Sequence, residues 1–228
     1  FLNSNNKIIR WIFQIRYLIY KQVILPLKIF FSKADYVICP DYVAPLITFN
    51  AKRITVMHDS LFWDKKNNYS FLWRKYFTTL INLGLNKGTQ IVTTSNYSKK
   101  NLSKIFRNNK KIHFVYQSFN LPKIIYSDYK TPKNYLLHIG SFEKRKDLIN
   151  LVKAFRLVDD PNLKLVLAGA QIINGNSKVL DEIKTFIFQN KLEGKVILAG
   201  YVSKDEASVL YKNARIYVFP SLDEGFGI

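Results

Sequence analysis

Two short polar segments, each directly after an apolar stretch, combine residue types that can bind a phosphorylated ligand. The first begins at Gly140 and carries the neighbouring cations Arg145 and Lys146. Cations beside the amino end of a following helix favour a diphosphate, because the free backbone amides and the helix dipole there also attract anions. A glycine at the start lets the backbone turn closely. Taken alone, this pattern is also typical of a solvated loop.

The second segment reads PSLDEGFGI over residues 220–228. Gly225 and Gly227, on either side of Phe226, would bring bare backbone amides close to a ligand. Glu224 would offer a carboxylate to sugar hydroxyls. This combination is far more specific than a basic turn.

A third polar group, His58 and Asp59, follows an apolar stretch that ends at Met57. A single histidine after a strand is usually structural, and His113 and His138 are given that interpretation. For His58 a functional role is favoured, because its position coincides with a motif described below.

Strand-like and helix-like patterns alternate along the chain, which predicts parallel βαβ units. The predicted strands cover residues 35–39, 53–57, 90–94, 112–116, 135–139, 164–168, 195–198 and 215–219. The predicted helices cover residues 70–85, 97–106, 147–158, 178–189 and 204–213. Residues 121–133, which include two prolines, are predicted to form a linker. We therefore expect two Rossmann-like domains, with ligands at the carboxyl ends of their strands.

The composition indicates a globular protein with an anionic partner. The chain has 228 residues, of which 48% are hydrophobic, and this is enough for a sizeable core. Its formal net charge of +19 fits nucleic acid, anionic lipid or a phosphorylated substrate, or a composition bias without function. No helix-turn-helix, zinc-finger or RNA-recognition signature occurs in the sequence, so no nucleic-acid partner is expected.

Residues 7–31 mix lysine and arginine with apolar and aromatic residues. No uninterrupted apolar run of about 18 residues occurs here, so a membrane span is not expected. Two interpretations stay open: an interfacial helix on an anionic membrane, with Trp11 and Tyr17 at headgroup depth, and a helix packed on the sheet with its lysine ammonium groups in water. Pro26 is predicted to kink or end the first part of this helix.

The single cysteine, Cys39, excludes an internal disulfide and matches a reducing compartment. With no cleavable signal in the sequence, a cytoplasmic location is expected, with peripheral contact to the inner face of the membrane. The chain begins at Phe1 and ends at Ile228 inside a structured pattern. We expect sequence to be missing at both ends.

Residues 220–227 resemble the P-S-x-x-E-G-F-G loop of the glycosyltransferase group 1 family, which consists of retaining GT-B enzymes. The family's second glutamate, eight positions after the first, would lie beyond Ile228. Residues 140–148 resemble the family's G-x-x-x-x-R-K-N-L turn, which binds the donor diphosphate. Ser141 departs from the additional arginine of many members, and Asp147 replaces the common asparagine.

The first half of the chain resembles the mannosyltransferase-like branch of the same family. His58 and Asp59 match its T-x-H-D turn, and residues 94–99 are similar to its serine-rich turn. Ser95 is predicted to cap the helix that follows. The strand around residues 197–202 is similar to one that frames the nucleotide base, although Tyr201 and Val202 could equally belong to the core.

The resemblance implies an α/β fold of the GT-B type, with two incomplete Rossmann-like domains whose parallel sheets face a cleft. Residues 1–122 would bind the acceptor and residues 123–228 the nucleotide sugar. The implied roles are catalytic for His58 and Glu224, donor-diphosphate binding for Gly140, Arg145, Lys146, Gly225, Phe226 and Gly227, and nucleotide-base binding for Tyr201 and Val202.

The implied activity is retaining transfer of a hexose, with mannose favoured, from a nucleotide sugar to a glycan or lipid-linked acceptor in surface polysaccharide synthesis. GDP-mannose is the favoured donor, UDP-sugars are the alternative, and no cofactor is expected. The sequence has no Cys/His metal spacing and no Asp-x-Asp clamp, so metal-independent transfer is expected. The alternatives are a GT-B epimerase or phosphorylase, a basic nucleic-acid-binding protein, and a truncated chain without activity.

Overall fold

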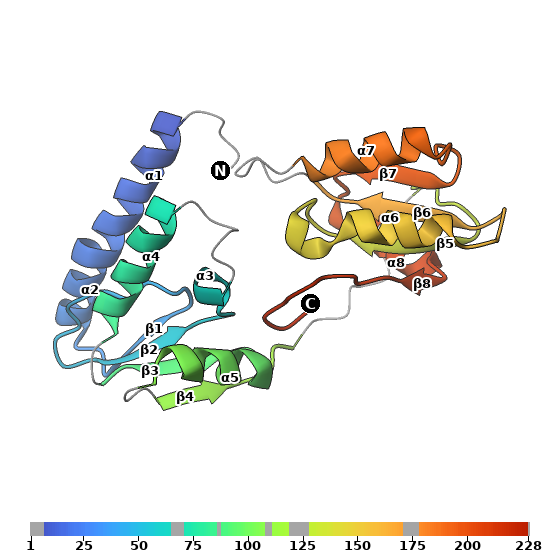
Figure 1. The fold of residues 1–228 in the computed structure, drawn as a ribbon. Helices are drawn as coiled ribbons and strands as arrows, with labels where there is room; N and C mark the ends of the chain where they lie inside the picture. The colour runs from blue at the N-terminus through green and yellow to red at the C-terminus, as the bar shows by residue number, and fades with distance from the viewer. Residues whose placement is uncertain are drawn as a thin grey trace. The chain divides into compact units, whose positions relative to one another are not determined.

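The computed structural model describes residues 7–64, 71–85, 88–107, 111–118, 128–170 and 178–227. The chain forms two compact units, each built around a parallel β-sheet (Figure 1). The first unit consists of Phe1–Phe119 together with Glu224–Ile228, and the second of Asn120–Asp223. This arrangement confirms the predicted α/β class.

The first unit contains a four-stranded parallel sheet in the order β1-β2-β3-β4. Its strands are β1 (Tyr36–Cys39), β2 (Lys52–Val56), β3 (Gln90–Thr93) and β4 (Lys111–Phe114). The register places Cys39 beside Thr55 and Val56 beside Val92. Because the strands are parallel, the residues that follow them gather at one edge of the sheet.

The helices of the first unit pack beside this sheet (Figure 1). They are α1 (Lys7–Ile19), α2 (Leu25–Ser32), α3 (Leu61–Asp64), α4 (Phe71–Gly84) and α5 (Asn96–Ile105). A π-helical turn, η1 (Tyr20–Ile24), joins α1 to α2, and Pro26 lies in the first turn of α2. Proline has no backbone N–H to continue the regular ladder, so the predicted interruption near Pro26 is confirmed as a π-turn.

The second unit contains a four-stranded parallel sheet in the order β7-β6-β5-β8. Its strands are β5 (Tyr135–Ile139), β6 (Lys164–Ala168), β7 (Val196–Gly200) and β8 (Ile216–Tyr217). The helical elements are the 3-10 turn η3 (Lys144–Lys146), α6 (Leu148–Arg156), α7 (Val179–Gln189) and α8 (Lys204–Asn213).

Side chains from alternate positions of β6 enter two separate cores. Leu165 and Leu167 pack with residues of α6 and α7, whereas Val166 and Ala168 pack with Leu210 of α8. In a parallel sheet covered on both faces, such a strand is apolar throughout. The site residues of this unit therefore follow strands of a sheet that is covered on both faces.

Most predicted elements are present, and several have the predicted bounds, including β5, β6 and α8. The strand predicted over residues 215–219 is shorter, with β8 ending at Tyr217. Val218 still donates its N–H to the Leu137 carbonyl at 2.8 Å, but Pro220 has no N–H with which to extend the ladder. The chain therefore leaves the sheet as a loop.

The predicted domain boundary after residue 122 lies outside the described residues. The last five residues, which the sequence assigns to the C-terminal domain, are grouped with the first unit. No helix in the described part of the chain is long and apolar enough to span a membrane.

Candidate functional site

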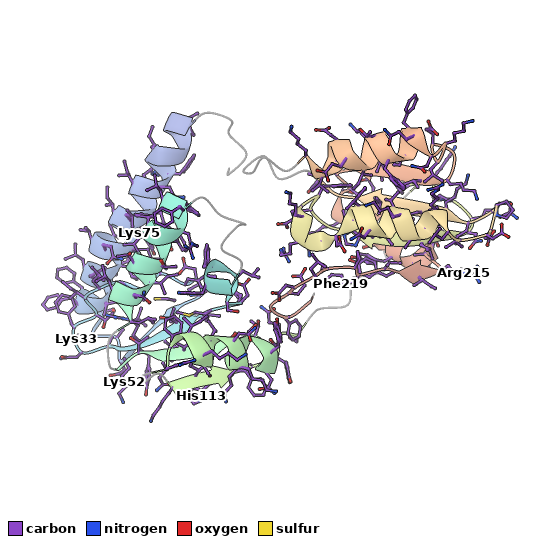
Figure 2. All side chains as sticks on the ribbon, viewed as in Figure 1. Lys33, Lys52, Lys75, His113, Arg215 and Phe219 are labelled. Carbon is purple, nitrogen blue, oxygen red and sulfur yellow. The ribbon has the colours of Figure 1, made fainter. Side chains whose placement is uncertain are left out.

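The basic turn of the second unit follows β5 directly. Arg145 donates from Nη2 to Glu143 Oε1 at 3.1 Å, and Ser141 Oγ donates to the same carboxylate oxygen. Lys146 places its Nζ over the ring of Phe219, 5.1 Å from the ring centroid; Figure 2 labels Phe219. The two predicted diphosphate ligands thus lie in one 3-10 turn, each already positioned by a neighbouring side chain.

Glu143 was not predicted as a site residue. It lies between Ser141 and Arg145 and accepts from both. Its carboxylate offsets part of the positive charge of the turn and holds the Arg145 guanidinium in one orientation. An acidic residue two positions before an arginine carries no distinctive sequence signal.

Gly140 is required by close packing beneath the turn. A Cβ at this position would lie 2.9 Å from Nε2 of His138, and a Cβ on Gly169 would clash with the Gly140 carbonyl. Gly140 also donates its N–H to the Ala168 carbonyl at 2.9 Å. The structure therefore gives Gly140 a packing role, and its contact with a diphosphate stays a prediction.

Asp147 explains how the turn passes into α6. Its backbone lies in the left-handed region, with φ of 52° and ψ of 35°. Aspartate and asparagine tolerate this region better than most residues, so the replacement of asparagine noted in the sequence preserves the turn. The Asp147 carboxylate accepts from Asn150 Nδ2 at 2.9 and 3.1 Å and makes no helix-capping bond.

Residues 220–223 are attached to the basic turn. Leu222 donates its N–H to the Arg145 carbonyl at 2.9 Å, and Arg145 Nη1 lies 3.4 Å from the Asp223 carbonyl oxygen. The two segments predicted from separate parts of the sequence therefore meet in the second unit.

Residues 224–227 lie at the carboxyl edge of the first sheet, within the first unit. The Gly225 carbonyl accepts hydrogen bonds from Ser95 Oγ and from Ser98 Oγ, the latter at 2.9 Å. A Cβ on Gly225 would clash with the His58 carbonyl. The ring of Phe226 lies 6.1 Å from that of Tyr116. Gly225 is thus needed for close backbone approach.

His58 follows β2 and has an exposed side chain. Its Nε2 lies 3.2 Å from the Pro40 carbonyl, which can only accept, so this contact assigns the proton to Nε2. The His58 carbonyl accepts from Thr94 Oγ1 at 3.0 Å and from Ser98 Oγ at 3.2 Å. The single Ser98 hydroxyl proton is therefore shared between the His58 and Gly225 carbonyls, a connection that sequence reasoning missed.

Ser95 caps α5 as predicted: its Oγ accepts from the Ser98 N–H at 3.0 Å. The same hydroxyl donates to Gly225. One serine therefore satisfies a helix amide and fixes a residue of the glycine-rich segment.

Asp59 and Tyr42 form a reciprocal pair beside His58. Tyr42 donates its hydroxyl to Asp59 Oδ1 at 2.8 Å and accepts from the Asp59 N–H at 3.0 Å. Leu61 also donates its N–H to Asp59 Oδ1, at 3.0 Å. These bonds fix the turn after β2 and leave the His58 ring exposed.

Asp41, which follows β1, accepts from two residues of the first helical segment. Lys21 Nζ lies 2.6 Å from Oδ1, and Tyr17 donates its hydroxyl to Oδ2 at 2.6 Å. Burial, with the Asp41 hydrogen bond second, raises the pKa of the Tyr17 hydroxyl well above its ordinary value. Nothing in the sequence pattern pairs residues 20 and 24 positions apart, so this cluster was not predicted.

The remaining predicted site residues differ in burial. The Tyr201 side chain is 82% exposed after β7, whereas Val202 packs against the core of the second unit. Packing therefore accounts for the Val202 side chain, and the role of both residues at a nucleotide base stays a prediction.

The other histidines keep structural positions. His138 is fully buried, with Nδ1 2.9 Å from the Val218 carbonyl, and His113 lies exposed on β4 (Figure 2). Among the side chains that the structure describes, no group of three or more His, Cys, Asp and Glu residues could hold a metal ion. Metal independence stays a prediction.

Similar structures share this fold at low sequence identity. A glycosyltransferase from Rickettsia africae aligns with a TM-score of 0.64 and 18% identity over 99% of this chain and 59% of that chain. Sucrose-phosphate synthase from Thermosynechococcus elongatus aligns with a TM-score of 0.62 and 22% identity over 79% of this chain and 47% of that chain. The fold is of the GT-B type. That the two sheets face a cleft stays a prediction.

Sequence relatives agree with this fold. The O-antigen chain mannosyltransferase RfbU of Salmonella typhimurium is 28% identical over 160 residues, which cover 70% of this chain and 43% of the relative. The O-antigen chain mannosyltransferase B of Escherichia coli is 30% identical over 97 residues, covering 42% of this chain and 25% of the relative. This chain thus spans less than half the length of either relative.

The family model described as glycosyl transferases group 1 matches residues 126–228. This range contains the basic turn and the glycine-rich segment described above. The part of the chain from residue 126 to residue 228 thus belongs to the group 1 glycosyltransferase family.

Proposed function

We propose that this chain is part of a retaining glycosyltransferase that moves a hexose from a nucleotide sugar to a glycan or lipid-linked acceptor in surface polysaccharide synthesis. The observation that carries the proposal is the attachment of residues 220–223 to the Arg145 turn. Membership of the group 1 family and the O-antigen relatives support it.

Arg145 and Lys146 are proposed to bind the donor diphosphate. Their positive charge would stabilise the negative charge that develops on the leaving nucleoside diphosphate, which is electrostatic catalysis. The backbone of Gly225, Phe226 and Gly227 would add amide donors. No metal ion or cofactor is assigned to this step.

His58 and Glu224 are proposed to contact the sugar being transferred. The His58 ring is exposed and oriented by the Pro40 carbonyl, and Glu224 begins the segment that is hydrogen-bonded to Ser95 and Ser98. Neither residue is assigned as a covalent nucleophile. The acceptor hydroxyl would attack on the face that the diphosphate leaves, with retention of configuration.

GDP-mannose is the favoured donor. Two relatives carry the name of O-antigen chain mannosyltransferases, and the mannosyltransferase-like His58–Asp59 turn is present here. UDP-sugars are the second choice. The nucleotide base would lie near Tyr201, whose ring is exposed.

Peripheral attachment to the cytoplasmic face of an anionic membrane is also proposed. Exposed apolar side chains recur along α1, η1 and α2 at helical spacing, and basic residues accompany them. They are Ile12, Ile15, Ile19, Val23, Leu27 and Phe30, with Arg16 and Lys28. Co-sedimentation with phosphatidylglycerol vesicles but not with phosphatidylcholine vesicles is expected, and equal sedimentation with both would refute this contact.

Binding of GDP-mannose, UDP-glucose and ADP-glucose to the whole protein tests the donor site. We expect one donor to bind and Lys146→Ala to weaken it about tenfold or more, because a charge-assisted contact to phosphate is lost. Lys144→Ala is the matched control, since Lys144 belongs to the same turn and is exposed. The donor site is wrong if no donor binds, or if both variants bind as the wild type does.

A further inference from the structure

The Asp41 cluster combines a buried cation with a partly exposed anion. The side chain of Lys21 is 8% exposed and that of Asp41 40%. Each carboxylate oxygen accepts one hydrogen bond of 2.6 Å, from Lys21 or from Tyr17. A carboxylate offers about four acceptor positions, so Asp41 keeps acceptor capacity on its exposed side.

Stabilisation of the fold does not account well for this pair. Burying an ammonium group carries a large desolvation penalty, and a buried ion pair is often no more stable than apolar residues of similar volume. Lys21 also lies in the π-turn η1, and such turns are frequent at functional sites. The arrangement is better explained as a means of holding the Asp41 carboxylate in one orientation.

The charge balance of the cluster indicates its ligand. Lys21 offsets the charge of Asp41, so the pair has little net attraction for a metal cation or a phosphate. A fixed carboxylate with spare acceptor positions suits neutral hydroxyl groups. Sugars present such groups, and a hydroxyl bonded to a carboxylate is a strong, short interaction.

Asp41 lies at the carboxyl edge of the first sheet, and parallel sheets bind ligands at this edge. Asp41 directly follows Pro40, whose carbonyl orients His58. The ring of Tyr42 lies 6.3 Å from that of His58 and 5.3 Å from that of Phe62. Aromatic rings beside a few fixed polar groups are typical of sites for small organic ligands.

We infer that Asp41 binds a hydroxyl group of the sugar acceptor, with Lys21 and Tyr17 as positioning residues. The inference rests on the proposed glycosyltransferase function for the identity of the ligand. The ligand that binds beside His58 in the first unit is then a neutral polyol.

The site is tested by measuring, with saturation-transfer NMR, how octyl α-mannopyranoside binds to the whole protein in the absence of donor. Asp41→Asn is expected to weaken binding about tenfold or more, since the charged acceptor is lost. Tyr17→Phe, which keeps the ring, is expected to weaken binding less. Asp35→Asn is the matched control, because Asp35 is an exposed aspartate just before the same strand, at its opposite end.

Binding of GDP-mannose without acceptor is measured on the same proteins. We expect Asp41→Asn to change this affinity by less than about twofold, because the donor contacts are elsewhere. A wild type that binds the glycoside through Asp41 but transfers no hexose to it from GDP-mannose, UDP-glucose or ADP-glucose would refute the proposed function and keep the hydroxyl site. The hydroxyl site is refuted if the wild type does not bind the glycoside, or if Asp41→Asn and Tyr17→Phe bind it as the wild type does.

Discussion

At the scale of single residues, Gly225 links the glycine-rich segment to the turn after β2. Its carbonyl accepts from Ser95 and Ser98, and its missing side chain allows the His58 carbonyl to approach. A methyl group here would meet the His58 carbonyl and would lie 3.0 Å from Asp59 Cβ. Both neighbours are held by hydrogen bonds, so they have little room to move.

Gly225→Ala is therefore expected to lower the free energy of unfolding by about 1–3 kcal/mol, as overpacking does. It should also reduce transfer, because His58 is displaced. Urea unfolding and the GDP-release rate measure the two effects. Gly194→Ala is the control, since a Cβ there has no neighbour within 4 Å. Equal stability of both variants would show that the Gly225 contact does not form.

The sequence placed His58 and Arg145 after strands and predicted the Ser95 cap, because each stands at a fixed place relative to a strand or a helix. The roles of His58 and Arg145 in a site stay predictions. Glu143 and Asp41 were not found, because their roles depend on partners that the fold supplies. For Asp41 those partners lie 20 and 24 residues earlier, on a helix whose packing the sequence does not determine.

At the scale of elements, α8 begins with a complete capping box. Ser203 Oγ accepts from the Glu206 N–H at 3.3 Å, and Glu206 Oε2 accepts from the Ser203 N–H at 2.7 Å. The second bond, with the Ser203 side chain next in importance, lowers the pKa of Glu206 below its ordinary value of 4.5. This helix packs Leu210 under the second sheet, so its start influences the core.

Ser203→Ala is expected to lower the free energy of unfolding by about 1 kcal/mol near neutral pH. Because the folded state depresses the pKa of Glu206, the contribution of Glu206 is present above pH 4.5 and disappears as the pH falls through the lower folded pKa. The difference between wild type and Glu206→Gln in urea unfolding should therefore shrink below pH 4.5. A difference that grows toward acid pH would contradict this assignment.

Regular periodicity predicted β5, β6 and α8 with the correct bounds, because apolar alternation and capping residues are local signals. The sequence predicted an interruption near Pro26 and a strand over residues 215–219, but not the π-helical form of η1 or the early end of β8. The first depends on how Pro26 and Lys21 are accommodated beside the sheet, and the second on which backbone groups of β5 remain within reach. Both are consequences of tertiary packing rather than of local sequence.

At the scale of the whole molecule, two parallel sheets each present polar residues after their strands. The second unit carries the cationic turn of Arg145 and Lys146, and the first unit carries His58 and Asp41. This division matches the two proposed sites. The donor site needs cations, which the second unit carries, and the acceptor site needs an acceptor for neutral hydroxyl groups, which the first unit carries. The net charge of +19 is consistent with anionic donors and lipid-linked acceptors.

The most direct test of the central claim follows the anomeric proton of mannose by NMR while the whole protein is incubated with GDP-mannose and octyl α-mannopyranoside. The proposed function predicts release of GDP and a new α-linked product, with turnover lost in Lys146→Ala but not in Lys144→Ala. Appearance of an epimerised GDP-sugar or of a sugar 1-phosphate, or an unchanged donor in the presence of each candidate acceptor, would contradict it.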